Sequence, residues 1–237
     1  MKHLTRFLLS AALLLPVALS AASFEGKVAM TMTMPKADPI PMTLSVKEGF
    51  SRTDTTMGKG VSASMIMDQA KQQIIILMPE QKMYMVQPMP KPEDFSEGKD
   101  AKSEVSFEKT GDTDKILGYS CTKYLVKYKD GHSEIWATDQ LGTYLGTGGG
   151  GVGAQRSKNS PSYAWEKALI GKAFFPLRTI VYGKDGKEAV RTEATSVTKQ
   201  SLPGSLFAAP ADFQKFEMPP VGDMMKGMMK GLMKGGN

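Results

Sequence analysis

Apolar and polar residues alternate along most of this 237-residue chain. Between Phe24 and Met34 the residues Val28, Met30, Met32 and Met34 share one parity, with Ala29, Thr31 and Thr33 between them. Successive side chains of a strand point to opposite faces, so this period of two predicts a β-strand. The same reasoning predicts strands at residues 42–46, 61–67, 73–78 and 82–87, and a short polar strand, a candidate sheet edge, at 50–55.

Two Asp-Gly pairs mark β-hairpins, because both positions of the preferred two-residue loop need positive φ. If Asp130-Gly131 forms the first loop, paired residue numbers sum to 261, and Lys127 then opposes Glu134. This register also pairs Leu125 with Trp136 and Val126 with Ile135. Each is a favourable cross-strand pair.

The second pair is Asp185-Gly186, which predicts that Val181 opposes Val190 and that Tyr182 opposes Ala189.

Helix signals are scarce. One helix is predicted from Ser160-Pro161 to a C-terminal Gly171, because proline starts helices well and glycine ends them. The fold class is therefore mainly β: an antiparallel sheet of about nine to eleven strands with few short helices. Periodicity leaves a sandwich, a closed barrel and a strongly curved half-barrel open.

The first 22 residues have the pattern of a secretory signal peptide. Lys2 and Arg6 precede an apolar stretch that ends near Leu19, and the small residues 20–22 supply a cleavage site. We expect a soluble mature protein that begins near Ser23, in the periplasm or outside the cell. A lipid anchor at the cleavage point would need a cysteine there, whereas the chain has a single cysteine, Cys121.

After processing, we expect a single antiparallel β domain at residues 23–216, with a glycine-rich loop at 146–159 and a flexible tail at 217–237 that is rich in Met, Lys and Gly. The formal net charge of +6 is modest, and acidic residues are interspersed with the basic ones. No cluster of Lys and Arg with interleaved aromatic residues occurs, so nucleic acid is not an expected partner.

Catalytic constellations do not emerge from the sequence. The glycines at 146–151 match G-x-G-x-x-G formally, but no helix follows at once to meet a pyrophosphate. His132 is the one histidine of the mature chain and is expected at an exposed hairpin tip, ~26 Å from Cys121 at ~3.3 Å per residue. We therefore predict no enzyme activity and no cofactor, although the scattered carboxylates leave an unrecognised enzyme as an alternative.

Cys121 itself is predicted to be a reduced, poorly reactive thiol, because no cation or helix N-terminus is evident nearby to stabilise a thiolate.

Methionine is unusually frequent, with 18 residues. The pairs Met30-x-Met32, Met65-x-Met67 and Met83-x-Met85 each place thioethers on one strand face. Methionine fills cores adaptably, so core packing or the wall of a lipophilic cavity is one interpretation. Cu(I) binding is the other, since soft thioethers suit that ion.

The tail repeats a four-residue unit from Met224 onward. On a helix its apolar residues would form one stripe with lysines beside it, as in helices that lie on membrane surfaces. A glycine in every turn costs about 1 kcal/mol each, so the free tail is expected to be disordered. Copper binding and an inert terminus are the alternatives. The candidate surface-binding residues are Met224, Met225, Lys226, Met228, Met229, Lys230, Leu232, Met233 and Lys234.

Several short motifs together resemble exported bacterial proteins of the domain of unknown function 4412 family. They are the stretches 67–68, 78–84, 116–121 with Tyr124, 134–136, 175–177, and 206–207 with Pro210 and Phe213. The most specific is Gly-Tyr-Ser-Cys at 118–121, followed by Glu-Ile-Trp at 134–136. The resemblance implies a curved half-barrel similar to periplasmic lipoprotein carriers of the LolA/LolB type. The family has no established activity, so no site residues follow from it.

Export, abundant methionine and the missing catalytic set predict a non-enzymatic binding module for a lipophilic ligand or client. The alternative is a methionine-based Cu(I)-binding protein of the cell envelope, and a purely structural envelope role is also open. The possible partners are a lipid or lipophilic ligand and, through the tail, a transient contact with a membrane surface. The oligomeric state is not specified by the sequence.

Overall fold

The computed structural model describes residues 24–57, 60–89, 106–144, 146, 172 and 174–217. Most of them belong to one sheet of twelve strands. The strands are β1 (Gly26–Thr33), β2 (Ile40–Lys47), β3 (Phe50–Met57), β4 (Val61–Asp68), β5 (Gln73–Met78), β6 (Met83–Pro88), β7 (Ser106–Ile116), β8 (Tyr119–Tyr128), β9 (Gly131–Thr138), β10 (Phe175–Tyr182), β11 (Glu188–Lys199) and β12 (Gln214–Lys215).

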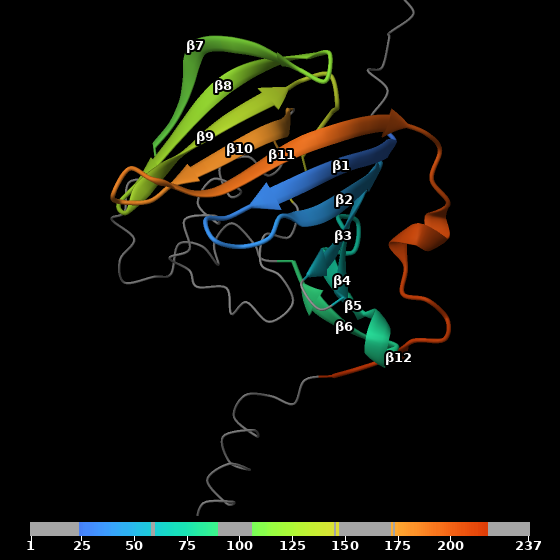
Figure 1. The fold of residues 1–237 in the computed structure, drawn as a ribbon. Helices are drawn as coiled ribbons and strands as arrows, with labels where there is room; N and C mark the ends of the chain where they lie inside the picture. The colour runs from blue at the N-terminus through green and yellow to red at the C-terminus, as the bar shows by residue number, and fades with distance from the viewer. Residues whose placement is uncertain are drawn as a thin grey trace, which may run out of the picture.

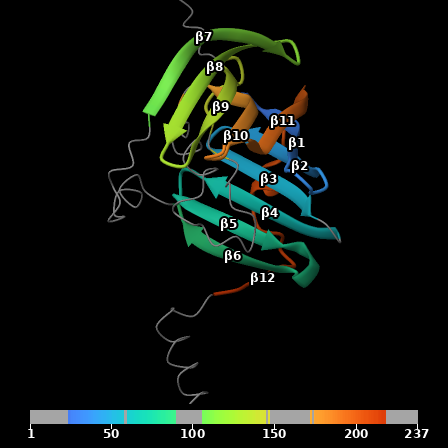
Figure 2. The same ribbon diagram turned by 60° about the vertical axis from the view of Figure 1, so that its left-hand side comes forward.

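The strand order is β12-β6-β5-β4-β3-β2-β1-β11-β10-β9-β8-β7, and all pairs are antiparallel except β12 with β6. Figures 1 and 2 show the sheet strongly curved, with β7 to β1 above and β3 to β6 forming a second wall below. One continuous sheet with β7 and β12 at its two ends is neither a sandwich nor a closed barrel. The prediction of a mainly β, curved antiparallel sheet is confirmed.

The sheet has an inner face, which carries Val28 and Leu44 on β1 and β2 and Met65 on β4. These residues share a face because Val28 pairs with Leu44, Leu44 with Thr53, and Thr53 with Met65. The main apolar core packs around the first two and reaches β8 to β11. Each large apolar side chain buried there contributes about 1.5–3 kcal/mol.

The opposite, outer face is covered over β2 to β6 by a segment we call the strap, residues 200–216. The strap contains the short 3₁₀ turn η4 (Gly204–Phe207) and ends in β12; a second 3₁₀ turn, η2 (Pro79–Gln81), joins β5 to β6. Figure 1 shows the strap running down the outside of β3 to β6. Leu202 and Phe207 are buried beneath it against Ile66, Ile75 and Leu77 of the sheet.

The polar strand predicted as an edge is not one. β3 lies between β2 and β4, and it pairs with β4 along its whole length and with β2 from Phe50 to Thr55. Its outer side chains are polar for another reason: Arg52 pairs with Asp54 at 2.8 Å and donates a hydrogen bond to the strap. A hydropathy pattern does not distinguish polar residues that make such contacts from polar residues that face solvent. The true edge with charged side chains is β7, which the alternation did not predict.

The predicted register of the first hairpin is wrong by two residues. Tyr128 pairs with Gly131 and Lys127 with His132, so the loop is Lys129-Asp130. Gly131 has a φ of 150° and belongs to β9, where its backbone lies against Tyr182 of β10. The glycine serves this close approach rather than the turn.

The second hairpin agrees in part. Val181 opposes Val190 as predicted, but a bulge then pairs Tyr182 with Glu188 instead of Ala189. His132 is also not an exposed turn residue: it is a half-buried strand residue whose ring stacks on Tyr182, with centroids 4.6 Å apart.

Four predicted segments lie outside the described residues: the signal peptide at 1–22, residues 147–159 of the glycine-rich loop, the helix at 160–171 and the tail beyond residue 217. Within the described part of the chain, no helix is long and apolar enough to cross a membrane.

Candidate functional site

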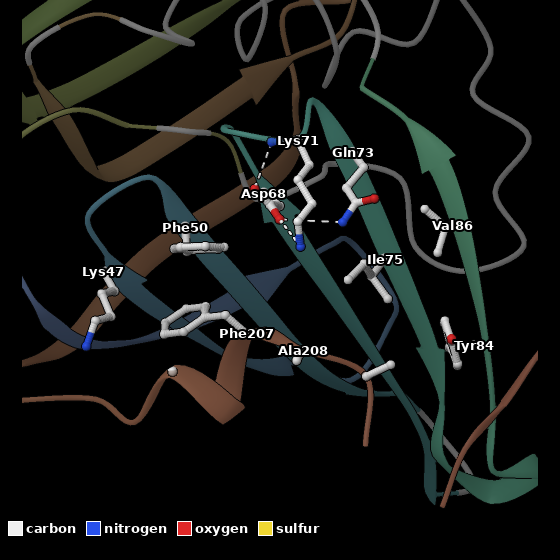
Figure 3. Close-up of a pocket in the computed structure, with 12 residues that line it drawn as sticks. Lys47, Phe50, Asp68, Lys71, Gln73, Ile75, Tyr84, Val86, Phe207 and Ala208 are labelled. Atoms are coloured by element: carbon white, nitrogen blue, oxygen red, sulfur yellow. Dashed lines mark hydrogen bonds and ion pairs between the residues drawn. The ribbon is translucent and has the colours of Figure 1, made fainter. Parts of the chain in front are cut away.

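A pocket of about 500 Å³ opens between the strap and the outer face of the sheet. Figure 3 shows its walls, with strands β4 to β6 on one side and the strap on the other. We call it the strap pocket. Its lining residues are Lys47, Phe50, Asp68, Lys71, Gln73, Ile75, Tyr84, Val86, Gly204, Phe207, Ala208 and Ala209.

The floor of the strap pocket is apolar because alternation and register bring apolar residues together across three strands. Ile75 of β5 pairs with Val86 of β6, and both point to the outer face. Phe50 and Phe207 close one end, with ring centroids 5.6 Å apart. Val86 is 37% exposed, so part of this floor faces open space.

The rim of the strap pocket carries Asp68, a carboxylate buried to 3% exposure at the end of β4. Its Oδ1 accepts the backbone N–H of Lys71 at 3.0 Å, and its Oδ2 pairs with the Lys71 ammonium at 3.4 Å. Gln73 Nε2 donates to the same Oδ2 at 3.4 Å (Figure 3). These contacts satisfy the buried charge, as a buried carboxylate requires. Lys71 is 72% exposed, so its ammonium can reach a bound molecule.

A polar clamp fixes the start of the strap beside the pocket. Glu25 Oε1 accepts the backbone N–H of Leu202 at 2.6 Å and pairs with the Lys47 ammonium at 3.1 Å. Lys47 also donates to the carbonyl of Leu202 at 2.7 Å. The Leu202 N–H first, and the lysine second, hold the pKa of the Glu25 carboxyl below its usual range.

A second clamp fixes η4. The guanidinium of Arg52 donates to the carbonyl of Leu206 at 3.0 Å and to Ser64 Oγ at 3.2 Å. Ser64 Oγ in turn donates to Asp54 Oδ1 at 2.6 Å. The strap is therefore held by two polar clamps, and Phe207 of η4 is buried between them and the sheet. These contacts fix the strap as one wall of the pocket.

The strap pocket combines residues that no sequence motif connects. Phe207 and Ala208 come from the far end of the chain, more than 100 residues after the strands they face. The resemblance motifs did include Leu206-Phe207, Pro210 and Phe213, and this was the available signal that the segment packs on the domain.

The candidate residues of the sequence analysis lie elsewhere. All nine residues of the proposed surface-binding tail, from Met224 to Lys234, fall outside the described residues. Cys121 is 1% exposed in the main core, and burial raises the pKa of its thiol. His132 stacks on Tyr182 near the ends of the two hairpins. Among the described residues, no three His, Cys, Asp or Glu side chains gather in a way that could hold a metal ion.

The strand methionines, in contrast, are brought together. Met30 pairs with Met42, and Met78 pairs with Met83. Met65 and Met67 form a separate inner-face cluster with Ile74, and Ile76 and Met89 pack against it.

The chain therefore has the architecture of a single open, curved and mainly antiparallel sheet with a pocket under a covering segment. The chain belongs to the family described as domain of unknown function DUF4412, whose model matches residues 24–213. No curated protein matches the chain.

Solved structures resemble this fold. An uncharacterised conserved protein from Thermus thermophilus is 9% identical and has a TM-score of 0.52 over 83% of this chain and 91% of its own. The MucA/MucB complex of Pseudomonas aeruginosa contains a chain with 10% identity and a TM-score of 0.45 over 84% of this chain and 63% of its own. The LolA superfamily protein NE2245 from Nitrosomonas europaea has 10% identity and a TM-score of 0.34, over 80% of this chain and 91% of its own. The first of these likenesses supports the fold, and we draw nothing from the other two.

Proposed function

We propose that the mature chain is an exported, non-enzymatic binding module that holds a lipophilic ligand in the strap pocket. The observation that carries the proposal is the pocket itself: about 500 Å³ with an apolar floor of Phe50, Ile75 and Phe207 under a polar rim. Ligand sites in proteins commonly combine apolar walls with polar groups that orient the ligand, and this pocket has both.

The rim decides what kind of ligand fits. Lys47 pairs with Glu25 and Lys71 pairs with Asp68, so these charges compensate one another. Because the floor is apolar and the rim polar, the ligand that fits is amphiphilic, with its chain on the floor and its polar end at the rim. The exposed end of Lys71 can meet an anionic head group.

Native mass spectrometry tests the proposal directly. The mature protein, purified from its own cell envelope or mixed with dodecanoate, is expected to carry a bound small molecule. Ala208→Trp fills the pocket and should abolish this adduct. Ala211→Trp adds the same ring to the same segment at an exposed residue that does not line the pocket, and should retain it. An absence of any adduct in the parent protein, or equal adducts in both variants, would overturn the proposal.

The proposed location of this module is the periplasm or the outside of the cell, because residues 1–22 have the charge and apolar pattern of an export signal.

The tail adds a proposed membrane contact through its apolar stripe and its lysines. Changing Met224, Met225, Met228, Met229 and Met233 to Leu keeps the stripe and removes the thioethers. Binding to anionic liposomes should survive that change; a parent protein that never binds liposomes would contradict the membrane contact.

Cu(I) binding is the second candidate function. It is favoured by a separate observation, the gathering of strand methionines on the inner face, away from the strap pocket.

A further inference from the structure

Two lysines line the strap pocket, and their surroundings differ. The ammonium of Lys47 donates to Glu25 Oε1 at 3.1 Å and to the carbonyl of Leu202 at 2.7 Å, so two of its three donors hold the strap. The ammonium of Lys71 has one partner among the described residues, Asp68 Oδ2 at 3.4 Å. The side chain of Lys71 is 72% exposed, against 34% for Lys47. Lys71 is therefore the lysine with donors left for a bound molecule.

The backbone around Lys71 is fixed at the rim of the pocket. On one side, the N–H of Gln69 donates to the carbonyl of Gly49 at 3.0 Å. On the other side, the carbonyl of Gln72 accepts the N–H of Met89 at 2.7 Å. Because both neighbours are tied to other segments, only the side chain of Lys71 has to move to meet a ligand.

Asp68 keeps hydrogen bonds when the ammonium of Lys71 turns to a ligand. Its Oδ1 accepts the backbone N–H of Lys71 at 3.0 Å, and its Oδ2 accepts Gln73 Nε2 at 3.4 Å. Neither donor depends on the position of the ammonium, so the buried carboxylate is not left without partners, which would be costly. An ion pair as exposed as this one is also weak. The geometry therefore leaves Lys71 free to exchange or share its partner.

The outer face of β5 changes from polar to apolar within two residues. Gln73 pairs with Asp68, and the next residue on that face, Ile75, pairs with Val86 and belongs to one apolar cluster with Phe207. Alternate residues of a strand lie roughly 6.6 Å apart. A polar head beside Gln73 thus places an attached chain on Ile75 and Val86 (Figure 3).

We infer that the strap pocket takes amphiphiles with an anionic head, and that Lys71 is the residue that selects the head. This inference rests on the proposed function and names its ligand class. The charged side chains that line the pocket are Lys47, Lys71 and Asp68, so the lining has one positive charge in excess. Carboxylate and phosphate oxygens accept charge-assisted hydrogen bonds from an ammonium, which a neutral head does not match.

Isothermal titration calorimetry of the full mature chain tests the ligand class with dodecanoate, dodecyl phosphate and 1-dodecanol, all below the concentrations at which they form micelles. Both anions should bind about 3- to 10-fold more tightly than dodecanol, as a partly exposed ion pair allows. The tighter anion identifies the source of the head, a fatty acid or a phosphate ester. Added salt should narrow the difference between the anions and dodecanol, because it screens exposed charges.

Two outcomes of this titration separate the possible failures. Equal affinities for all three ligands would overturn the anionic class and leave the pocket as a site for apolar chains. Binding of none of them would overturn the proposed function together with its ligand class.

Lys71→Met and Lys187→Met make the same change at two exposed lysines that pair with an aspartate. Lys187 pairs with Asp185 at 3.7 Å in the turn between β10 and β11 and does not line the pocket. Lys71→Met should lower the dodecanoate affinity to that of dodecanol or below it, since Asp68 remains, and leave the dodecanol affinity unchanged. Lys187→Met should bind all three ligands as the parent does.

Lys71→Arg keeps the positive charge and should keep the preference for anions, and circular dichroism checks that each variant is folded. A preserved preference for anions in Lys71→Met would overturn the role of Lys71. Equal losses of dodecanoate and dodecanol binding in Lys71→Met would also overturn it, because they would show that the lysine supports the pocket and does not recognise the head.

Discussion

Glu25 shows how one residue ties the two ends of the domain together. Its carboxylate lies before β1 and accepts the N–H of Leu202 at the start of the strap. It is one-third exposed, so its ion pair with Lys47 is screened by solvent and weak. Burial of Leu202 and Phe207 supplies most of the adhesion of the strap, and Glu25 sets where the strap begins.

The lowered pKa of Glu25 predicts a pH-dependent strap. A carboxyl whose pKa is lower in the folded state stabilises that state at neutral pH, and the stabilisation is lost as the pH falls through the folded pKa. Amide exchange at Leu202 should therefore accelerate on acidification relative to amides in β1. Glu25→Gln should show fast exchange at neutral pH and remove this dependence. Exchange that is equally pH-dependent in Glu25→Gln would contradict the assignment.

Cys121 should be a slow thiol. Burial raises the pKa of the Cys121 thiol, which disfavours thiolate formation. Because the residue is only 1% exposed, reagents also reach it poorly. Maleimide labelling of the native protein should be slower by orders of magnitude than labelling in denaturant, measured by mass spectrometry. Complete labelling of the folded protein within minutes would show that the thiol is accessible.

The hairpin between β8 and β9 shows what turn chemistry predicts and what it misses. The Asp-Gly signal located the hairpin and the parity of its strands correctly, since the register error of two residues keeps every side chain on its face. The error arose because Gly131 is required by its contact with a third strand, β10, and not by the turn. A Cβ at this position would overlap the carbonyl of Tyr182. Contacts between segments about 50 residues apart are not visible in a local pattern.

This contact predicts unequal effects of two glycine substitutions. Gly131→Ala should lower the free energy of unfolding by more than about 2 kcal/mol, because backbone must move to admit the methyl group. Gly183→Ala in the neighbouring hairpin meets the flexible carboxylate of Asp185 at 3.2 Å and the Lys187 carbonyl at an ordinary contact distance of 3.9 Å, and should cost within about 1 kcal/mol. Denaturant unfolding measures both. Equal, small losses would show that β9 and β10 do not approach as closely as described.

Strand β7 is an edge protected against pairing with other chains. Its ladder with β8 is interrupted between Lys109 and Thr113, and most of its side chains are exposed. Bulges and charged residues, lysine above all, discourage edge-to-edge association. The sequence alternation is broken by this irregularity, which is why the strand was not predicted.

Lys109→Val should therefore promote self-association. Lys27→Val makes the same change at an exposed residue of β1, which already pairs on both sides with β2 and β11. Size-exclusion chromatography and light scattering should show larger species for the first variant and behaviour unchanged from the parent for the second. Identical profiles for the two variants would contradict the protective role of the β7 charge.

At the scale of the whole molecule, alternation and turn signals were enough to predict a mainly β chain but not its architecture. The resemblance to the DUF4412 family favoured the open, curved sheet, and the structure confirms it. The strap pocket could not be predicted, because it forms where Phe207 and Ala208 meet β5 and β6, and neither partner carries a polar motif that marks a site.

The proposed ligand site lies between the strap and the outer face of the sheet. Hydrogen–deuterium exchange of the mature protein with and without dodecanoate tests it most directly. We predict slower exchange in residues 73–77 and 204–209 on adding dodecanoate, with no change in β8 or β11. Protection confined to β8 or β11, or no protection anywhere at concentrations that saturate binding, would contradict the strap pocket as the ligand site.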